Sequence, residues 1–244
     1  MTSNITLNDS QTKAYVNLKK FLVSKNNYNF LLLGPAGSGK TTVIVNTFNG
    51  YKKRIAFCAF TNKATQVLQD VYSKFQIKLA ADIKTIHKLL ELEPDYLNNE
   101  FELKFKFDRN KLKDMLNYDV IIFDECSTIS SELYKFIEEA REYVNFKTGK
   151  NLKYIYLGDS YQLTPVGEEK SPIFGVAISN KWPVSKLMQI MRCANEFLSN
   201  IYTRFINYSL IYMYEIIYHN PKYQISHNML KQSMTNNGNS FKAC

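Results

Sequence analysis

The 244-residue sequence has few of the residues that build disulfide-rich or metal-clustered proteins. Its four cysteines are far apart with no Cys-x-x-Cys pair, and it has only three histidines, so neither a disulfide scaffold nor a zinc cluster is expected. No apolar run approaches the length that crosses a bilayer, and the first residues lack the features of a secretory leader. These absences favour a soluble, intracellular protein with no membrane partner.

The composition is that of a globular chain, with 45% hydrophobic and 22% charged residues. Two of the cysteines, Cys58 and Cys126, lie in or beside apolar runs, so we expect them to be buried free thiols. The net charge of +9 favours a polyanionic partner, nucleic acid ahead of a membrane surface. A basic surface that serves only solubility is the alternative.

The most informative stretch is residues 34–41, which read GPAGSGKT between the apolar run at 28–33 and the apolar residues at 42–45. This is a phosphate-binding loop with a strand before it and a helix after it. The glycines let backbone N–H groups converge on phosphate oxygens, Lys40 adds a positive charge, and the Thr41 hydroxyl can ligate Mg²⁺. A structural loop without a nucleotide is the alternative. The residues predicted to bind the phosphates are Gly34, Pro35, Ala36, Gly37, Ser38, Gly39, Lys40, Thr41 and Thr42.

Strand and helix patterns alternate along the rest of this region. An opening helix is expected from Asn8 onward, with Asn8, Asp9 or Ser10 as its cap, and the helix after the loop should end near Asn49-Gly50. Further strands are predicted at 54–59, 119–123 and 154–157, with helices at 61–75 and 130–143. Short, continuously apolar strands are typical of a parallel sheet covered on both faces. The fold class is therefore α/β, a P-loop NTPase sheet flanked by helices.

A different pattern interrupts this order at about 91–118. Residues 101–107 alternate apolar and charged side chains, and Pro94-Asp95 and Asn98-Asn99 have the composition of turns. The pattern predicts a solvent-facing strand in a small β-hairpin inserted into the α/β core.

Two adjacent carboxylates, Asp124 and Glu125, follow the apolar strand at 119–123. A P-loop ATPase needs one carboxylate at a strand end to hold Mg²⁺ and a second to orient and deprotonate water. Asp124 fits the first role and Glu125 the second. Capping of a helix is the alternative.

The ordered set of short motifs resembles superfamily 1 DNA helicases. The motifs are Leu7-Asn8 with Gln11, residues 34–42, Phe60-Thr61-Asn62-Lys63-Ala64, Thr85-Ile86-His87, Asp124-Glu125, Gly158-Asp159 with Gln162, and Arg192. The continuation Gln-Leu-x-Pro-Val-Gly after Gly158-Asp159 is similar to the RecD-like and phage Dda-like branch, which moves 5′ to 3′. The resemblance spans residues 7 to about 192 and implies a RecA-like ATP-binding domain over residues 1–200.

The resemblance implies roles for residues outside the loop. Gln11 would contact the adenine, Gln162 would sense the γ-phosphate or its attacking water, and Arg192 would stabilise charge on the γ-phosphate. The implied catalytic residues are Lys40, Glu125, Gln162 and Arg192. The implied ligands are ATP and Mg²⁺.

The resemblance also implies contacts with single-stranded DNA. The residues concerned are Phe60, Thr61, Asn62, Lys63, Thr85, His87 and Pro165. Aromatic rings stack on bases of any sequence, and hydroxyl, amide and ammonium groups suit phosphates. Ordinary packing is the alternative for Phe60 and His87. The strand at 101–107 occupies the place where relatives insert a strand-separating pin.

The sequence also lacks the late motifs of this family. It has no Gln-Gly pair, and only one arginine, Arg204, follows Arg192. We therefore expect residues 201–244 to form an atypical, partly helical and poorly ordered tail in place of a second lobe. Either the reading frame is truncated or frame-shifted, or another chain supplies the second half.

A chain of this kind should bind ATP·Mg²⁺ weakly, hydrolyse it slowly and unwind nothing, because closure of two lobes moves the DNA. A nucleotide- and DNA-binding module without turnover is the alternative from another class, and a small-molecule kinase leaves residues 158–167 unexplained. The resemblance further implies other replication or repair proteins as partners, and it leaves the oligomeric state open.

Overall fold

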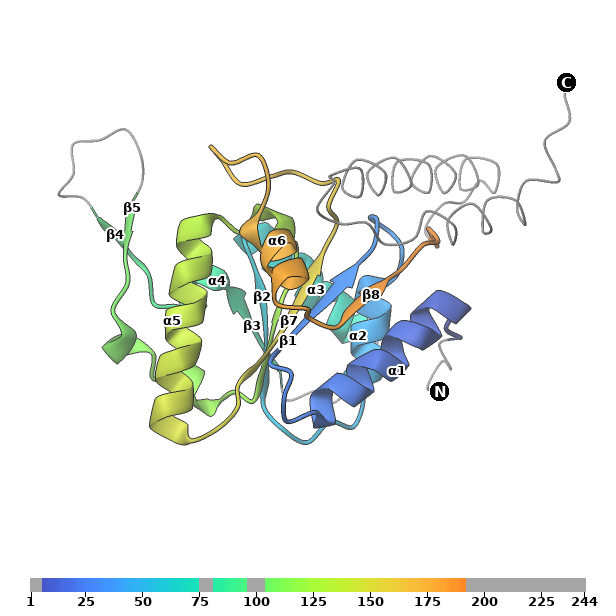
Figure 1. Ribbon diagram of the computed structural model, residues 1–244, viewed down its shortest axis with the longest axis horizontal. Coiled ribbons are helices and arrows are strands. Elements are labelled where there is room, and N and C mark those ends of the chain that lie inside the picture. The colour runs from blue at the N-terminus through green and yellow to red at the C-terminus, as the bar shows by residue number, and fades with distance from the viewer. Residues whose placement is uncertain (1–5, 75–80, 96–103, 192–244) are drawn as a thin grey trace, which may run out of the picture. The chain divides into compact units, whose positions relative to one another are not determined.

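The computed structural model describes residues 6–74, 81–95 and 104–191, and its centre is a six-stranded sheet (Figure 1). The strand order is β3-β2-β6-β7-β1-β8, and all neighbouring strands are parallel. The strands are β1 (Asn29–Leu33), β2 (Ile55–Ala59), β3 (Ala81–Thr85), β6 (Val120–Phe123), β7 (Lys153–Gly158) and β8 (Val184–Lys186). The predicted α/β fold is confirmed.

Helices cover both faces of this sheet (Figure 1). They are α1 (Asp9–Val23), α2 (Lys40–Phe48), α3 (Asn62–Lys74), α4 (Ile86–Leu89), α5 (Ser131–Thr148) and α6 (Pro172–Ser179). Because successive side chains of a strand point to opposite faces, Phe30 and Leu32 pack with α1 and α2, whereas Leu31 belongs to the core under α5 and α6. The central strands are buried on both sides, which explains their continuous apolar sequence.

The opening helix begins as its sequence predicts. Asn8 is the N-cap of α1: its side-chain oxygen accepts a hydrogen bond from the Gln11 N–H at 2.9 Å. The Gln11 side-chain oxygen in turn accepts from the Asn8 N–H at 3.0 Å, which completes a capping box. This reciprocal pair fixes where α1 starts, and with it the position of Gln11.

A buried lysine holds the other end of α1. The Lys153 ammonium, on the first residue of β7, donates hydrogen bonds to the carbonyls of Phe21, Ser24 and Asn27 at 3.0, 2.7 and 2.7 Å. Its Nζ also lies 4.6 Å from the centre of the Phe21 ring. The last carbonyls of a helix lack partners within it, so Lys153 joins the end of α1 to the sheet.

We expect Lys153→Met to lower the free energy of unfolding by about 2 kcal/mol, because three carbonyls lose a charged donor while the apolar stem is kept. Urea denaturation followed by circular dichroism measures the change. Lys52→Met removes an equal charge from an exposed residue and should leave the urea midpoint unchanged. Equal midpoints for the two variants would contradict the role given to Lys153.

The predicted hairpin insertion is present, but the prediction of a turn at Pro94-Asp95 is wrong. Residues Glu93–Asp95 form strand β4, which pairs antiparallel with β5 (Lys104–Lys106). Pro94 therefore lies in a strand, opposite Phe105. In a two-stranded sheet each strand has a free edge, and proline is tolerated because no ladder donor is needed there. Residues 98–99 and 101–103 lie outside the described residues.

Two aromatic side chains attach the hairpin and its continuation to the body of the domain. Phe105 lies 4.7 Å from the His87 ring in α4, and Phe107 stacks at 5.2 Å on Phe136 of α5. Both are half-buried, while Lys106 between them is exposed. The alternating pattern therefore turns its aromatic side toward the domain.

Other expectations are confirmed with changed boundaries. The helix predicted at 130–143 is α5, which continues to Thr148 and ends at Gly149 in the left-handed conformation. Cys58 and Cys126 are buried free thiols. The predicted tail at 201–244 lies outside the described residues. No helix in the described part of the chain is long and apolar enough to cross a membrane.

Candidate functional site

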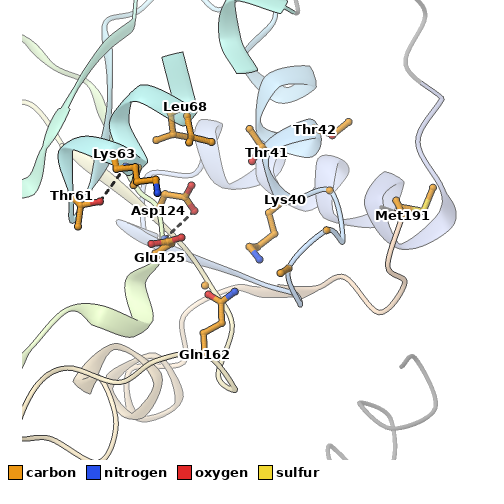
Figure 2. Close-up of a pocket in the computed structure, with 16 residues that line it drawn as sticks. Lys40, Thr41, Thr42, Thr61, Lys63, Leu68, Asp124, Glu125, Gln162 and Met191 are labelled. Carbon is orange, nitrogen blue, oxygen red and sulfur yellow. Dashed lines mark hydrogen bonds between the residues drawn. The ribbon is translucent and has the colours of Figure 1, made fainter. Parts of the chain in front are cut away.

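The predicted site residues lie together because the strands before them are parallel. The phosphate loop follows β1, Phe60 and Thr61 follow β2, Asp124 follows β6, and Gln162 comes soon after β7. Carboxyl ends of parallel strands meet at one edge of a sheet, and ligands bind there. Figure 2 shows Lys40, Asp124, Glu125 and Gln162 around one hollow at this edge.

This hollow is a cavity of about 740 Å³. The predicted residues on its wall are Ala36, Gly37, Gly39, Lys40, Thr41, Thr42, Thr61, Lys63, Asp124, Glu125 and Gln162. The other wall residues are Ala64 and Gly158, which belong to the motifs of the resemblance but are given no role there, and Val67, Leu68 and Met191, which are not predicted as site residues. Thr61 and Lys63, which are predicted to contact DNA, thus line the same cavity as the phosphate loop.

The loop geometry requires its glycines. Gly39 has a φ of 87°, and a Cβ there would collide with the Gln11 amide nitrogen. A Cβ on Gly34 would lie 2.5 Å from the Ser38 hydroxyl oxygen. That buried hydroxyl has no hydrogen-bond partner within residues 6–74, 81–95 and 104–191. At these glycines the loop has no room for side chains, so its backbone N–H groups can approach a phosphate group closely.

Lys40 is folded against its own loop. Its ammonium donates to the Gly34 and Pro35 carbonyl oxygens at 2.6 and 3.2 Å. Burial lowers the pKa of Lys40, whereas the nearby carboxylates of Asp124 and Asp159 oppose the shift. The hydrogen-bond partners of Lys40 are neutral, so its positive charge can pair with an anion.

The two adjacent carboxylates have different environments. Asp124 accepts a hydrogen bond from the Glu125 N–H at 3.0 Å and is partly buried, while Glu125 is exposed. Burial raises the pKa of Asp124, and the Glu125 charge raises it further, against the effects of that N–H and of Lys40. Glu125 adopts a left-handed φ of 53°, a conformation that costs a non-glycine residue roughly 1–2 kcal/mol. Such strain often persists at functional positions.

Asp124 and Thr41 both line the cavity and offer oxygen donors to it. A carboxylate and a hydroxyl are ligands of the type that Mg²⁺ prefers. The donor set therefore fits Mg²⁺, with Asp124 and Thr41 as the residues that would hold it.

We expect Asp124→Asn to stabilise the fold at neutral pH. A carboxyl group with a raised folded pKa stabilises the fold below its unfolded pKa, and this contribution is lost as pH rises through the folded pKa. Because the pKa of Asp124 is raised in the folded state, this side chain opposes folding at pH 7, and a neutral amide removes that cost. Thermal denaturation should show a higher midpoint for Asp124→Asn but not for Glu139→Gln, an exposed control on α5. An unchanged or lower midpoint for Asp124→Asn would contradict this account.

Gln11 is buried against the loop. Its side-chain nitrogen donates to the Ser38 carbonyl at 3.0 Å, and its side-chain oxygen takes part in the α1 capping box. Both ends of the amide are therefore engaged, and Gln11 ties α1 to the phosphate loop. The predicted adenine contact remains a prediction.

Gln162 and Arg192 come from the part of the chain after β7. Asp159 supports a turn after β7, because its backbone oxygen accepts from the Gln162 N–H at 3.2 Å. Gln162 lines the cavity. Arg192 lies outside the described residues, but the Met191 N–H donates to the Gly37 carbonyl at 2.8 Å. The chain before Arg192 is thus bonded to the phosphate loop.

The predicted DNA contacts form a second group. Phe60 is 38% exposed, and its ring meets that of His87 edge-on at 5.3 Å. His87 is half-buried between Phe60 and Phe105, and burial lowers its pKa, so the ring is neutral at pH 7. His87 thus packs against both rings, and its DNA contact stays a prediction, whereas Phe60 presents an accessible face.

The remaining members of this group are dispersed. The Thr85 hydroxyl oxygen accepts from the Lys88 N–H at 3.1 Å and caps α4. Asn62 and Lys63 are exposed at the start of α3, whereas Pro165 is buried. Thr85, His87 and Pro165 do not line the cavity.

Comparisons with known proteins agree with this architecture. A family model described as an AAA domain matches residues 21–168. An uncharacterized protein of Acanthamoeba polyphaga mimivirus is 35% identical over 197 residues, which are 74% of this chain and 38% of that protein. An uncharacterized protein of Methanocaldococcus jannaschii is 32% identical over 169 residues, which are 66% of this chain and 13% of that protein. The chain thus spans well under half the length of both relatives.

Solved structures give the same result for the fold. Bacteroides Pif1 bound to ssDNA has a TM-score of 0.58 and 19% identity, covering 84% of this chain and 47% of that one. Pif1 helicase from Bacteroides in complex with ADP-AlF3 and ssDNA has a TM-score of 0.57 and 20% identity over the same shares. The resemblance to superfamily 1 helicases is thereby confirmed for the fold, which is RecA-like.

Proposed function

The chain belongs to the AAA domain family, and on this premise we propose that its residues 1–200 form the ATP-binding motor lobe of a superfamily 1 DNA helicase of the RecD-like, Dda-like branch. One observation carries the proposal. A single cavity joins the loop lysine, Lys40, to Asp124, Glu125 and Gln162. Phosphoryl transfer to water needs these groups together: a cation for the phosphates, oxygen ligands for Mg²⁺, a base and a residue that orients water.

Phosphate binding falls to the loop between β1 and α2. Its backbone N–H groups and Lys40 bind the β- and γ-phosphates, and Thr41 and Asp124 hold Mg²⁺. When bound, Mg²⁺ neutralises charge on the phosphate oxygens. Gln11 keeps the loop in place through Ser38, and its position at the loop is compatible with a contact to the base.

Hydrolysis falls to the residues opposite the loop. Glu125 is exposed to the cavity and serves as the base that takes a proton from the attacking water. Gln162 orients that water or the γ-phosphate, and Arg192 adds positive charge to the transferred group. The hydrogen bond from the Met191 N–H to the Gly37 carbonyl holds the residue before Arg192 at the loop, which supports this proposed role.

Single-stranded DNA is the proposed polymer. The Bacteroides Pif1 structures include complexes with ssDNA, and the net charge of +9 suits a polyanion. Phe60 offers a ring for base stacking, and Asn62 and Lys63 offer exposed donors for phosphates. The β4–β5 hairpin is proposed as the element that meets the DNA junction.

The proposal is tested by ATP hydrolysis with and without single-stranded DNA. Wild type should exceed Lys40→Ala and be stimulated by DNA. Glu125→Gln should lower kcat by about 100-fold or more, the typical contribution of a general base, yet bind ADP nearly as well as wild type. Glu139→Gln on α5 is the control for charge loss.

Two outcomes would count against these assignments. A DNA-stimulated rate that survives Glu125→Gln would remove Glu125 as the base. A wild-type rate equal to that of Lys40→Ala, with ADP and DNA still bound, would favour a binding module that does not hydrolyse ATP.

The DNA contact of Phe60 has its own test. Loss of one stacking ring should weaken binding of labelled oligothymidylate by about tenfold, so Phe60→Ala should show this change in fluorescence anisotropy. Phe146→Ala removes an even more exposed ring, 84% accessible, from α5. Weakening by Phe146→Ala to the same extent would mean that the Phe60 effect is not specific.

A further inference from the structure

A carboxylate outside the proposed catalytic set joins two loops of the site. Glu168 accepts a hydrogen bond from the Ser131 N–H at 2.7 Å through one oxygen and from the Ser131 hydroxyl at 2.9 Å through the other. Ser131 is the first residue of α5. A helix N-terminus has unpaired N–H groups and a partial positive charge, so an anion is favoured there. The contact therefore holds the chain after β7 against the start of α5.

The two joined segments both lead directly to cavity residues. Ser131 lies six residues after Glu125, and Glu168 lies six residues after Gln162. The first connection is short and ordered by hydrogen bonds: the Glu125 carbonyl accepts from the Thr128 N–H at 3.0 Å. A displacement of α5 from the Gln162 loop would thus change the position of Gln162 relative to Glu125.

The Gln162 loop makes little use of apolar packing. Leu163 is 82% exposed and Val166 is fully exposed, whereas Pro165 between them is buried. The Pro165 carbonyl accepts from the Glu168 N–H at 3.1 Å, which forms the turn that presents Glu168 to α5. Segments with few buried contacts open easily, so hydrogen bonds at the ends of this loop must restrain it.

Neighbouring contacts show that the two segments are close along their length. The Ser171 hydroxyl donates to the Ile129 carbonyl at 2.8 Å in a buried position. At the other end, a Cβ on Gly158 would lie 2.5 Å from the Cys126 sulfur. These contacts fix the two ends of the segment, and the Glu168 contact holds the part of the loop that follows Gln162.

We propose that Glu168 is a positioning residue of this site: its carboxylate holds the Gln162 loop against α5 and thereby fixes Gln162 relative to Asp124 and Glu125. The inference rests on the proposed ATPase function and adds a residue that touches neither nucleotide nor metal. Small displacements of reacting groups are costly in catalysis, since about 1 Å can cost about 100-fold in rate.

The test compares Glu168→Ala, Glu168→Gln and Glu169→Ala in the full 244-residue chain. Glu169 is the next residue, is exposed and carries the same charge, so Glu169→Ala is a matched control. Glu168→Ala should lower the kcat of ATP hydrolysis about tenfold, with KM for ATP changed less than about twofold because the phosphate loop is intact. Glu168→Gln can still accept from the Ser131 N–H and should recover most of the rate.

A second readout does not depend on turnover. The affinity for ADP with aluminium fluoride, relative to ADP alone, reports contacts to the transferred group. This ratio should fall about tenfold in Glu168→Ala and stay at the wild-type value in Glu169→Ala.

The possible results distinguish failure of the Glu168 role from failure of the proposed ATPase function. If wild type binds ADP no better than Lys40→Ala, the proposed function fails. If wild type binds ADP and its aluminium fluoride complex, but Glu168→Ala behaves as Glu169→Ala does, only the role of Glu168 fails. A rise in KM and in the ADP dissociation constant without a change in kcat would also overturn it, because that pattern indicates general loosening of the nucleotide site.

Discussion

The parallel arrangement of a sheet buried on both faces is the constraint on which the site depends. The central strands β1, β6 and β7 are buried between helices, so most of their side chains are apolar. The polar functional side chains therefore come after the ends of these strands. Parallel order then brings the carboxyl ends of these strands to one edge. The phosphate loop, Asp124-Glu125 and Gln162 are neighbours for this reason, although more than a hundred residues separate the first from the last.

The same constraint explains which parts the sequence could predict. Residues 34–41, Asp124-Glu125 and the Asn8 cap are local signals, because each depends on a few consecutive residues and on the strand or helix beside them. The central strands can be predicted because each is a continuous apolar run. By contrast, β3 and β8 lie at the sheet edges and are less buried, so neither carries a continuous apolar run.

The features that the sequence did not predict depend on partners distant along the chain. Pro94 is in a strand because Phe105 lies opposite it, and the sequence leaves packing and a DNA contact open for His87, whose ring lies between Phe60 and Phe105. Glu168 meets Ser131 across 37 positions of sequence. Composition near Glu168 gives no hint of this contact, since Glu169 beside it is chemically identical and exposed.

The charges of the site oppose its burial. Burial disfavours the ionised forms of both Lys40 and Asp124, and each partly offsets the cost for the other. Neither forms a direct ion pair within residues 6–74, 81–95 and 104–191. Lys40 donates hydrogen bonds to two carbonyl oxygens, and Asp124 accepts one from the Glu125 N–H. The fold thus holds opposite charges close together but unpaired. In the proposed function, a ligand with phosphates and a divalent cation would supply a counter-charge to each, so that binding would relieve an electrostatic cost that folding alone leaves in place.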